Sequence, residues 1–143
     1  MDYEAKKIVA ILSNRVPADI ALNIVGHLCI AIGRYADEHI MGRPILTDAS
    51  GNAHLGISCF PLIVTKVKPS RLKAAIAQAK ADPSLLVAEY PREMLDTRTD
   101  DDLAAALAAR PTDELEYLGA VIYGDTDAVN AVTGRFQLWK PEI

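Results

Sequence analysis

Residues 6–36 read KKIVAILSNRVPADIALNIVGHLCIAIGRYA and pass from a β-like run into an almost wholly apolar helical segment. The apolar run over 6–12 predicts a buried strand, and the pattern that follows predicts a helix over about 18–36. Three polar side chains interrupt the apolar part of this helix. They recur at every fourth position, so each step advances about 40° around the helix and the three form one narrow stripe. The stripe consists of Asp19, Asn23 and His27.

The polar stripe predicts the position of a site. A helix that is apolar on every side except one seam is expected to be buried, and the seam then faces a water-accessible cleft or internal partners. We therefore expect a solvent-reachable hollow beside this helix, at the rim of a sheet. An imidazole that is sealed inside the protein and bonded to main-chain atoms, with no adjoining hollow, would contradict this expectation.

Size and composition indicate one folded domain over residues 1–143. With 50% apolar and 24% charged residues, the chain can form one core without a disulfide or a metal. No apolar run is long enough to cross a bilayer, and residues 1–4 lack the basic and apolar regions of a signal peptide. We expect a cytoplasmic protein without membrane contact, in which Cys29 and Cys59 are buried reduced thiols.

Charge is divided unevenly along the chain. Residues 1–80 hold ten Lys and Arg against six Asp and Glu, whereas residues 81–143 hold five against thirteen. This distribution argues against nucleic-acid binding by the whole surface, although one basic cluster leaves a local contact open. The cluster consists of Lys66, Lys68, Arg71 and Lys73. Solvated residues at the end of a strand and a helix explain it better. The acidic run 100–102 fits a helix start, where the helix dipole favours negative charge, and not a metal site.

The rest of the chain alternates between strand and helix patterns. A β-hairpin is expected over 44–57, directly after the first helix, with its turn at 48–52. Further strands are expected at 60–67, 85–88, 117–123 and 136–138, and further helices at 69–82, 99–107 and 126–132. The alternation predicts a three-layer α/β/α sandwich with a mainly parallel mixed sheet of four to five strands, to which the hairpin is added.

In such sheets, ligands gather beyond the carboxyl ends of the strands. Ser13, Asn14 and Arg15 follow the first strand directly, and we expect them to lie near the polar stripe. The loops 90–92 and 124–126 are expected at the same edge. Arg15 is the best candidate for binding an anion, although a plain surface arginine is equally compatible with the sequence.

Several segments of the chain resemble a known fold. Residues 23–27 (NIVGH), 119–124 and 131–138 (AVTGRFQL) follow the opening strand in the order found in the type II peptidyl-tRNA hydrolases. The chain is more similar still to a family of uncharacterised bacterial proteins called domain of unknown function two thousand. In that family the helix also reads Leu-Asn, three small or apolar residues, and His. The resemblance covers nearly the whole chain in element order and implies a peptidyl-tRNA hydrolase type II-like fold with a cleft beside the first helix.

The chain departs from the hydrolases in the segments that carry the resemblance. Asn23 stands where the hydrolases have a lysine, and His27 stands where they have a glutamine. The third strand runs into residues 91–97 (PREMLDT) in place of an Asp-Ala-Gly segment. A neutral amide cannot stabilise a developing oxyanion or hold a phosphate as a cation does. The hydrolytic activity of that family is therefore not carried over to this chain.

His27, Asn23 and Ser13 are the candidates for catalysis. His27 is suited to act as a general base, oriented by Asn23 or Asp19, but a histidine bonded to a neighbouring loop fits the pattern equally well. Asn23 in mid-helix is expected to bond a specific partner, which the loop backbone also provides. Cys29 lies about 200° around the helix from His27, which excludes a Cys–His pair and indicates a structural cysteine. The candidates for ligand binding are Asn14, Arg15 and Asp19.

Two functions are open on this sequence. The first is binding of a small ligand or partner in the cleft beside the first helix, which the missing lysine and the acidic composition favour. The second is an enzyme, a hydrolase of ester or acyl bonds with His27 as general base. We expect neither a cofactor nor a metal, because no metal-ligand spacing, phosphate loop or dinucleotide motif is present.

The apolar first helix also bears on assembly. Its apolar surface exceeds what one sheet face covers, so either other helices or a second copy must enclose it. The related hydrolases are commonly dimeric, and together these points predict a homodimer.

Overall fold

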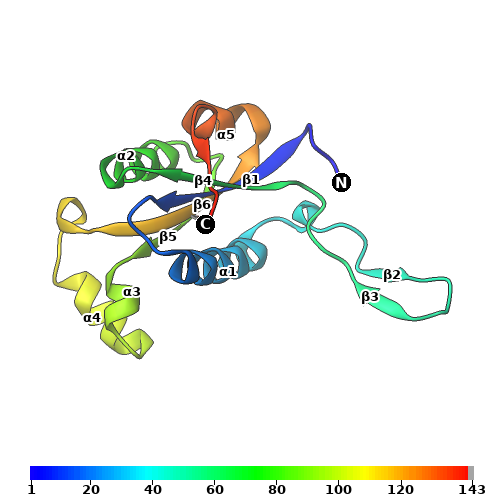
Figure 1. Cartoon of the computed structure of the whole chain (residues 1–143), viewed down its shortest axis with the longest axis horizontal. Helices are drawn as coiled ribbons and strands as arrows, with labels where there is room; N and C mark the ends of the chain where they lie inside the picture. Colours follow the sequence, from blue (N-terminus) through cyan, green and yellow to red (C-terminus); the bar gives the residue numbers. More distant parts are fainter. Residues whose placement is uncertain (142–143) are drawn as a thin grey trace.

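The sheet at the centre of the protein has five strands in the order β5-β6-β1-β4-β7. The computed structural model describes residues 1–141 (Figure 1). The strands are β1 (Lys6–Ser13), β4 (Leu62–Val67), β5 (Leu86–Pro91), β6 (Tyr117–Asp125) and β7 (Gln137–Leu138). One face of the sheet is covered by α1 (Ala18–Tyr35), and the other by α2 (Pro69–Lys80) and α5 (Thr126–Thr133) (Figure 1). The prediction of an α/β fold with four to five strands is confirmed.

The prediction of a mainly parallel sheet is wrong. Of the strand pairs described, only β1–β4 is parallel, and β5–β6, β6–β1 and β4–β7 are antiparallel. The strands β1, β4 and β5 do run in one direction, which fits crossovers through α1 and α2. After β5 the chain passes through α3 (Glu93–Asp96), α4 (Asp100–Ala108) and η2 (Thr112–Glu114) and returns in the opposite direction. β6 then lies between β5 and β1, so two antiparallel pairs replace one parallel pair.

α1 is buried along one face only. Its buried residues are Ala21, Ile24, Leu28 and Ile32, whose spacing marks one side of a helix. This side packs on β5 and β6, whereas the opposite side is exposed and includes Leu22 and Ile30. No second layer of helices covers its outer side within residues 1–141, so of the two enclosures that the sequence left open, other helices of the chain or a second copy, the first is wrong (Figure 1). None of the helices in that range, α1 included, has the length and apolarity needed to cross a membrane.

The starts of two other helices follow the local sequence. Pro69 is the first residue of α2, a position at which a helix does not use the missing N–H. Thr99 caps α4, since its hydroxyl accepts a hydrogen bond from the N–H of Asp102 at 3.1 Å. The acidic run 100–102 therefore lies in the first turn of α4, beside the positive end of the helix dipole, as predicted.

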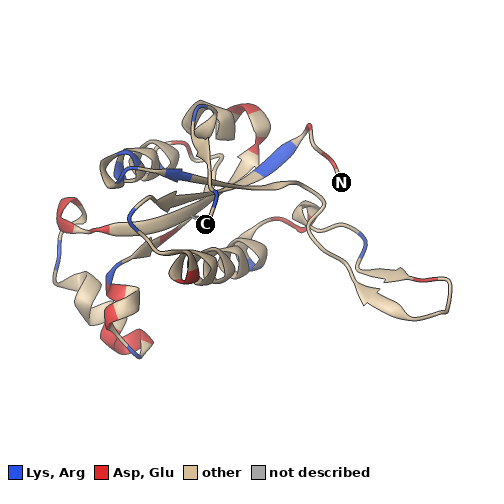
Figure 2. Cartoon of the chain, in the orientation of Figure 1, with Lys and Arg blue, Asp and Glu red and all other residues tan. Residues whose placement is uncertain are grey.

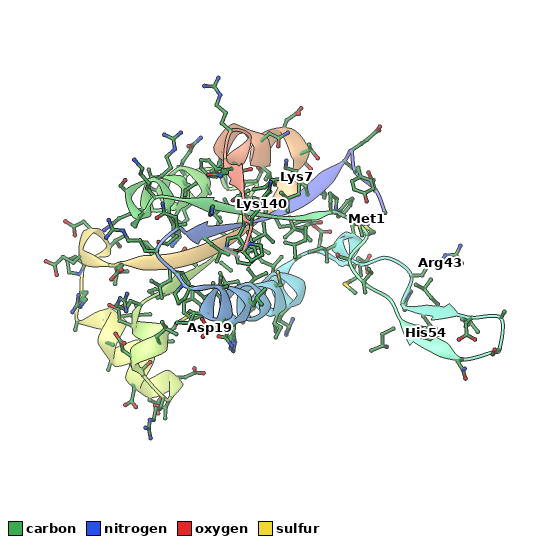
Figure 3. All side chains as sticks on the ribbon, viewed as in Figure 1. Met1, Lys7, Asp19, Arg43, His54 and Lys140 are labelled. Atoms are coloured by element: carbon green, nitrogen blue, oxygen red, sulfur yellow. The ribbon has the colours of Figure 1, made fainter. Side chains whose placement is uncertain are left out.

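The predicted hairpin after α1 is confirmed, and it stands away from the body of the protein. After the short helix η1 (Glu38–Ile40), β2 (Ile45–Thr47) and β3 (Ala53–Leu55) pair antiparallel. Figure 1 shows this two-stranded sheet projecting beyond the central sheet and its helices, and Figure 3 shows Arg43 and His54 on the projection. No residue of β2 or β3 is buried.

The contact between α1 and the middle of the sheet depends on Gly119 in β6. A methyl group on Gly119 would lie 2.8 Å from Cγ2 of Ile24 and 3.2 Å from Cδ2 of Leu12. Both of these side chains are fully enclosed, so neither has free space to move into. The absence of a side chain at Gly119 therefore sets how closely α1 approaches the sheet.

We predict that Gly119→Ala lowers the free energy of unfolding by about 1–3 kcal/mol through overpacking, and that Ile24→Ala lowers it by about 2–5 kcal/mol through a cavity. In the double variant the new methyl group fills part of that cavity. The combined loss is therefore expected to be smaller than the sum of the single losses by about 1 kcal/mol. Urea unfolding of the wild type and the variants measures this coupling. Additive losses would show that the two positions are not in contact.

Candidate functional site

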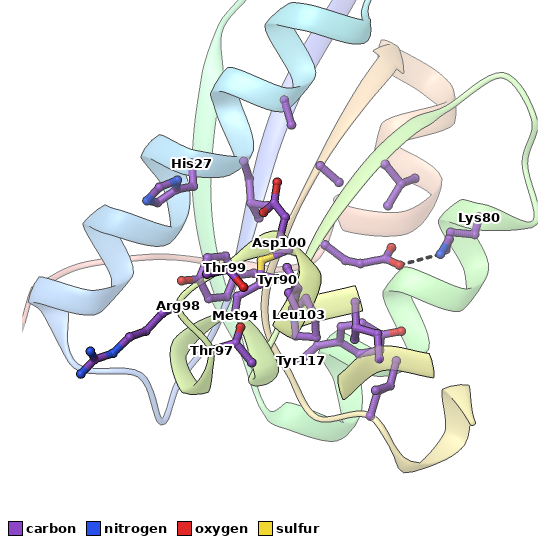
Figure 4. Close-up of a pocket in the computed structure, with 18 residues that line it drawn as sticks. His27, Lys80, Tyr90, Met94, Thr97, Arg98, Thr99, Asp100, Leu103 and Tyr117 are labelled. Atoms are coloured by element: carbon purple, nitrogen blue, oxygen red, sulfur yellow. Dashed lines mark hydrogen bonds and ion pairs between the residues drawn. The ribbon is translucent and has the colours of Figure 1, made fainter. Parts of the chain in front are cut away.

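A large hollow lies along the free edge of β5. It has a volume of about 790 Å³ and opens between α1, the edge of β5 and the α3–α4 segment (Figure 4). From α1 and β5 its lining takes His27, Leu28, Ala31 and residues 87–91. From the α3–α4 segment it takes Met94, Thr97, Arg98, Thr99, Asp100, Leu103 and Leu107, and it is completed by Lys80, Leu115 and Tyr117.

β5 contributes five consecutive residues to this hollow because it is the last strand of the sheet. One of its edges pairs with β6, whereas no backbone hydrogen bond joins its other edge to another element among the described residues. Ala88 and Tyr90 belong to the face that packs on α1, and Val87 belongs to the opposite face, so the hollow wraps around the strand edge. Burial raises the pKa of Tyr90 and of Tyr117, so both phenols stay protonated to a higher pH than an exposed tyrosine does.

The α3–α4 segment forms the outer wall. α4 has no fully buried residue, yet Leu103 and Leu107, four positions apart, are both half-buried and line the hollow. Thr97 ends α3 by donating its hydroxyl proton to the carbonyl of Glu93 at 2.8 Å. α4 packs chiefly on α3, and Met94 of α3 packs against the core, so α3 connects this wall to the body of the protein.

Charged groups lie at two ends of the hollow. At one end the ammonium group of Lys80 donates to Oε1 of Glu89 at 2.6 Å, and this bond raises the pKa of Lys80 (Figure 4). Oε2 of Glu89 is buried and has no hydrogen-bond partner in the described structure, so one acceptor is free. His27 and Arg98 lie at the other end (Figure 4). The walls between these ends are mostly apolar, and they also include one further charged residue, Asp100 (Figure 4).

The polar stripe of α1 reaches the hollow only at His27. His27 is exposed at the rim, whereas Asp19 and Asn23 are exposed outside the lining. Of the three histidines, only His54 has a side-chain hydrogen bond among the described residues. The arrangement expected for a general base, with Asn23 or Asp19 bonded to the imidazole, is therefore not formed in this structure.

Ser13, Asn14 and Arg15 line a different hollow. It has a volume of about 390 Å³ and lies where the carboxyl ends of the parallel strands β1 and β4 meet. Lys66 and Lys140 also line it, so with Arg15 it carries three cations. Ser13 is buried, and its hydroxyl accepts a hydrogen bond from the N–H of Arg15 at 3.3 Å.

The structure thus divides the candidate residues between two places. His27 lies nine positions after Ala18, the first residue of α1, which is roughly 14 Å along the helix axis. Ser13 precedes that helix and lies at the carboxyl end of β1. The hydroxyl of Ser13 therefore cannot attack a bond that the imidazole of His27 activates.

The loops that the sequence placed at the same edge have separate positions. Tyr90 and Pro91 line the large hollow, but Nε of Arg92 donates to the carboxylate of Glu116 at 2.7 Å. Residues 124–126 lie elsewhere, at the end of β6, where Asp125 bonds Lys6 at 3.0 Å.

The members of the basic cluster that the sequence indicated face different partners. Lys66 lines the smaller hollow, whereas the ammonium group of Lys73 donates to the carbonyl of Leu115 at 3.0 Å. The guanidinium group of Arg71 lies 5.9 Å from the centre of the Phe136 ring. Figure 2 shows basic residues on α2, on β4 and at the start of β1, and acidic residues gathered on α4.

Thiol and metal chemistry find no support at α1. Cys29 is partly buried against the core, and this burial raises the pKa of its thiol, which fits the predicted structural role. In the part of the chain that the structure describes, no group of three or more His, Cys, Asp or Glu residues is arranged to hold a metal.

The sequence did not identify the α3–α4 wall as part of a site. Leu103 and Leu107 have the spacing of one helix face, and this signal predicted only the helix. The remaining wall residues follow no motif, and they approach β5 only because the chain reverses after that strand. These residues are Met94, Thr97, Arg98 and Thr99.

We predict that His27→Ala changes the free energy of unfolding by less than about 0.5 kcal/mol, because the imidazole is exposed and unbonded. Leu28→Ala, at the next and buried position, is the matched comparison and should cost about 2–5 kcal/mol. Urea unfolding measures both. A loss above about 1 kcal/mol for His27→Ala would show that the imidazole has a structural partner.

Comparison with known proteins identifies a family and a similar fold, and both matches are to proteins of unknown function. The family model described as a protein of unknown function, DUF2000, matches residues 6–140. A solved structure of a protein of unknown function from Agrobacterium tumefaciens strain C58 is similar, with a TM-score of 0.80 and 21% sequence identity. The alignment covers 95% of this chain and 98% of the other. No curated protein matches the sequence.

Proposed function

We propose that this chain, which belongs to the DUF2000 family of proteins of unknown function, binds a small ligand in the hollow between α1, the edge of β5 and the α3–α4 wall. The observation that carries the proposal is the hollow itself, which has mostly apolar walls, polar groups at its ends and a free strand edge. The resemblance to type II peptidyl-tRNA hydrolases stays a prediction.

The size and the lining of the hollow are those of a ligand site. Pockets for small molecules enclose about 300–1,000 Å³ and are mainly apolar, with a few polar groups that fix orientation. The volume of about 790 Å³ falls within that range. Leu103, Leu107 and Met94 supply apolar surface on one side, and Leu28 supplies it on the other.

The polar groups indicate the chemistry of the ligand. An apolar body fits the walls, and a polar or negatively charged end fits the side of the hollow where His27 and Arg98 lie. The free oxygen of Glu89 and the unpaired edge of β5 offer acceptors and donors along the strand. The ligand class is therefore an elongated, mainly apolar molecule with one polar or anionic end.

Hydrolysis of an ester or acyl bond is less well supported. Ser13 and His27, two of the catalytic candidates that the sequence suggested, line different hollows. No described side chain orients the imidazole of His27 by a hydrogen bond. A hydrolase with His27 as general base stays a prediction, and the geometry favours binding.

We predict that Ala31→Phe weakens binding in the hollow, because Ala31 lines it and a phenyl ring there occupies ligand space. The probe is 1-anilinonaphthalene-8-sulfonate, which joins an apolar aryl body to an anionic group. We expect its dissociation constant, measured by fluorescence titration of the folded protein, to rise by about tenfold or more.

Ala104→Phe is the matched control, since Ala104 lies on α4 but outside the lining and is exposed. It should bind the probe as the wild type does. Urea unfolding is run alongside, because a loosened core also binds this probe. Equal binding by all three folded proteins would mean that the probe sits elsewhere, and no saturable binding by the wild type would remove the support for a ligand of this class.

A further inference from the structure

The projecting arm, residues 41–58, is held to the body only at its base. Met41 and Ser58 form an isolated bridge, and the N–H of Gly42 donates to the carbonyl of Ile57 at 2.9 Å. Beyond this base, β2 and β3 pair with each other and pack on no other described element. A two-stranded hairpin is at best marginally stable alone in water, so this arm needs a surface to pack on.

The arm has one mainly apolar face and one face of mixed polarity. Ile45 lies opposite Leu55 and Thr47 lies opposite Ala53, so these four side chains share one face. On the other face, Leu46 lies opposite His54, whose imidazole bonds Asp48 at 2.9 Å. The apolar face is open, and Leu55 is 82% exposed.

The backbone of the arm nevertheless has a defined conformation, fixed by its turn and by its base. Oδ1 of Asp48 accepts the N–H groups of Ser50 and Asn52 at 2.9 and 3.0 Å, and Gly51 takes a φ of +87° in the same turn. At the base, a Cβ on Gly56 would lie 1.7 Å from the carbonyl oxygen of Arg43, so only glycine fits there. A defined backbone with an uncovered apolar face indicates an interaction surface.

A second uncovered surface lies on the outer face of α1, where Leu22, Gly26, Ile30 and Gly33 share one side of the helix with Asp19 of the first turn. Leu22 is 66% exposed and Ile30 is 73% exposed. An added Cβ at Gly26 or Gly33 would meet nothing within 4 Å. The side chains of Leu22 and Ile30 are therefore next to glycine positions that are open to solvent. Charge is sparse here, since Asp19 and Arg34 are the charged residues of α1, and Figure 2 shows the arm almost equally free of charge.

We propose that the arm of each chain packs on the outer face of α1 in a second copy of the same chain, as a two-fold dimer. Met41 and Ser58 anchor the arm beyond the carboxyl end of α1, and from there it extends away from its own body (Figure 1). It is therefore not placed to cover its own α1. In a two-fold dimer each chain supplies one arm and one helix, so both apolar surfaces are covered by one contact repeated twice.

The area available matches what a stable dimer needs. A fully exposed Leu, Ile or Met offers on the order of 100 Å² of apolar surface, and the exposed members of the arm, its base and α1 together offer on the order of 400 Å² per chain. These residues are Leu22, Ile30, Met41, Ile45, Leu55 and Ile57. A standard interface covers about 800 Å² per partner, of which about 60% is apolar. The two surfaces thus supply most of the apolar part of one interface.

Sedimentation and light scattering of the full chain test this proposal. We expect the wild type to be a dimer at about 50 μM, a concentration at which interfaces of standard size are occupied. Leu55→Lys on the arm and Ile30→Glu on α1 should each raise the dissociation constant about tenfold or more, because each places a charge in an apolar contact. Leu138→Lys, at an exposed leucine in β7, is the matched control and should leave the dimer intact.

Mixing the two variants tests which surfaces meet. In a mixed dimer Lys from one chain lies against Glu from the other, and the second contact is wild type, so an equimolar mixture should recover a dimer that neither variant forms alone. Ile45→Lys replaces the arm variant if circular dichroism shows that Leu55→Lys is unfolded. A monomeric wild type, or a dimer untouched by either variant, overturns the proposal, and so does a mixture that stays monomeric.

Discussion

The packing of Ile24 against the bare backbone of Gly119 fixes the position of α1, and the architecture around it follows. β6 is the strand on which α1 rests, and β6 lies between β1 and β5, so the same contact aligns the helix with three strands. A side chain at Gly119 would push α1 outward. Because α1 is held close to the sheet and its contact with the sheet ends at the edge of β5, a hollow forms there, with His27 at its rim.

Local sequence patterns predicted the elements well, because strands and helices are encoded by periodicity and by residues at their ends. The apolar run at β1, Pro69 at the start of α2 and Thr99 at the cap of α4 each act within a few residues. The direction of β6 is not encoded in this way. Its residues 117–124 are buried, so the strand is apolar toward both faces and fits the sheet in either direction. Its antiparallel placement depends on the chain reversal after β5, which no local pattern indicates.

The candidate site was predicted less well, for two physical reasons. Spacing placed Asp19, Asn23 and His27 on one stripe of α1, but spacing cannot say which stripe faces solvent when Leu22 and Ile30 are also exposed. The second reason is that two walls of the hollow come from β5 and α4, whose approach to α1 is a property of the whole fold. The sequence indicated correctly that His27 and the loop at Tyr90 lie near one another, since both line the large hollow. Ser13 and Arg15 line the smaller hollow, which carries three cations.

The free edge of β5 also bears on how the protein behaves at high concentration. A sheet edge with unpaired N–H and C=O groups is a template for edge-to-edge aggregation. Here the other edge of the sheet is the very short β7, and the open strand is screened by α4 and marked by a charged pair, Lys80 and Glu89, beside it. The wall that shapes the hollow therefore also protects the edge of β5 from pairing with other chains, and loss of α4 would expose this edge to aggregation.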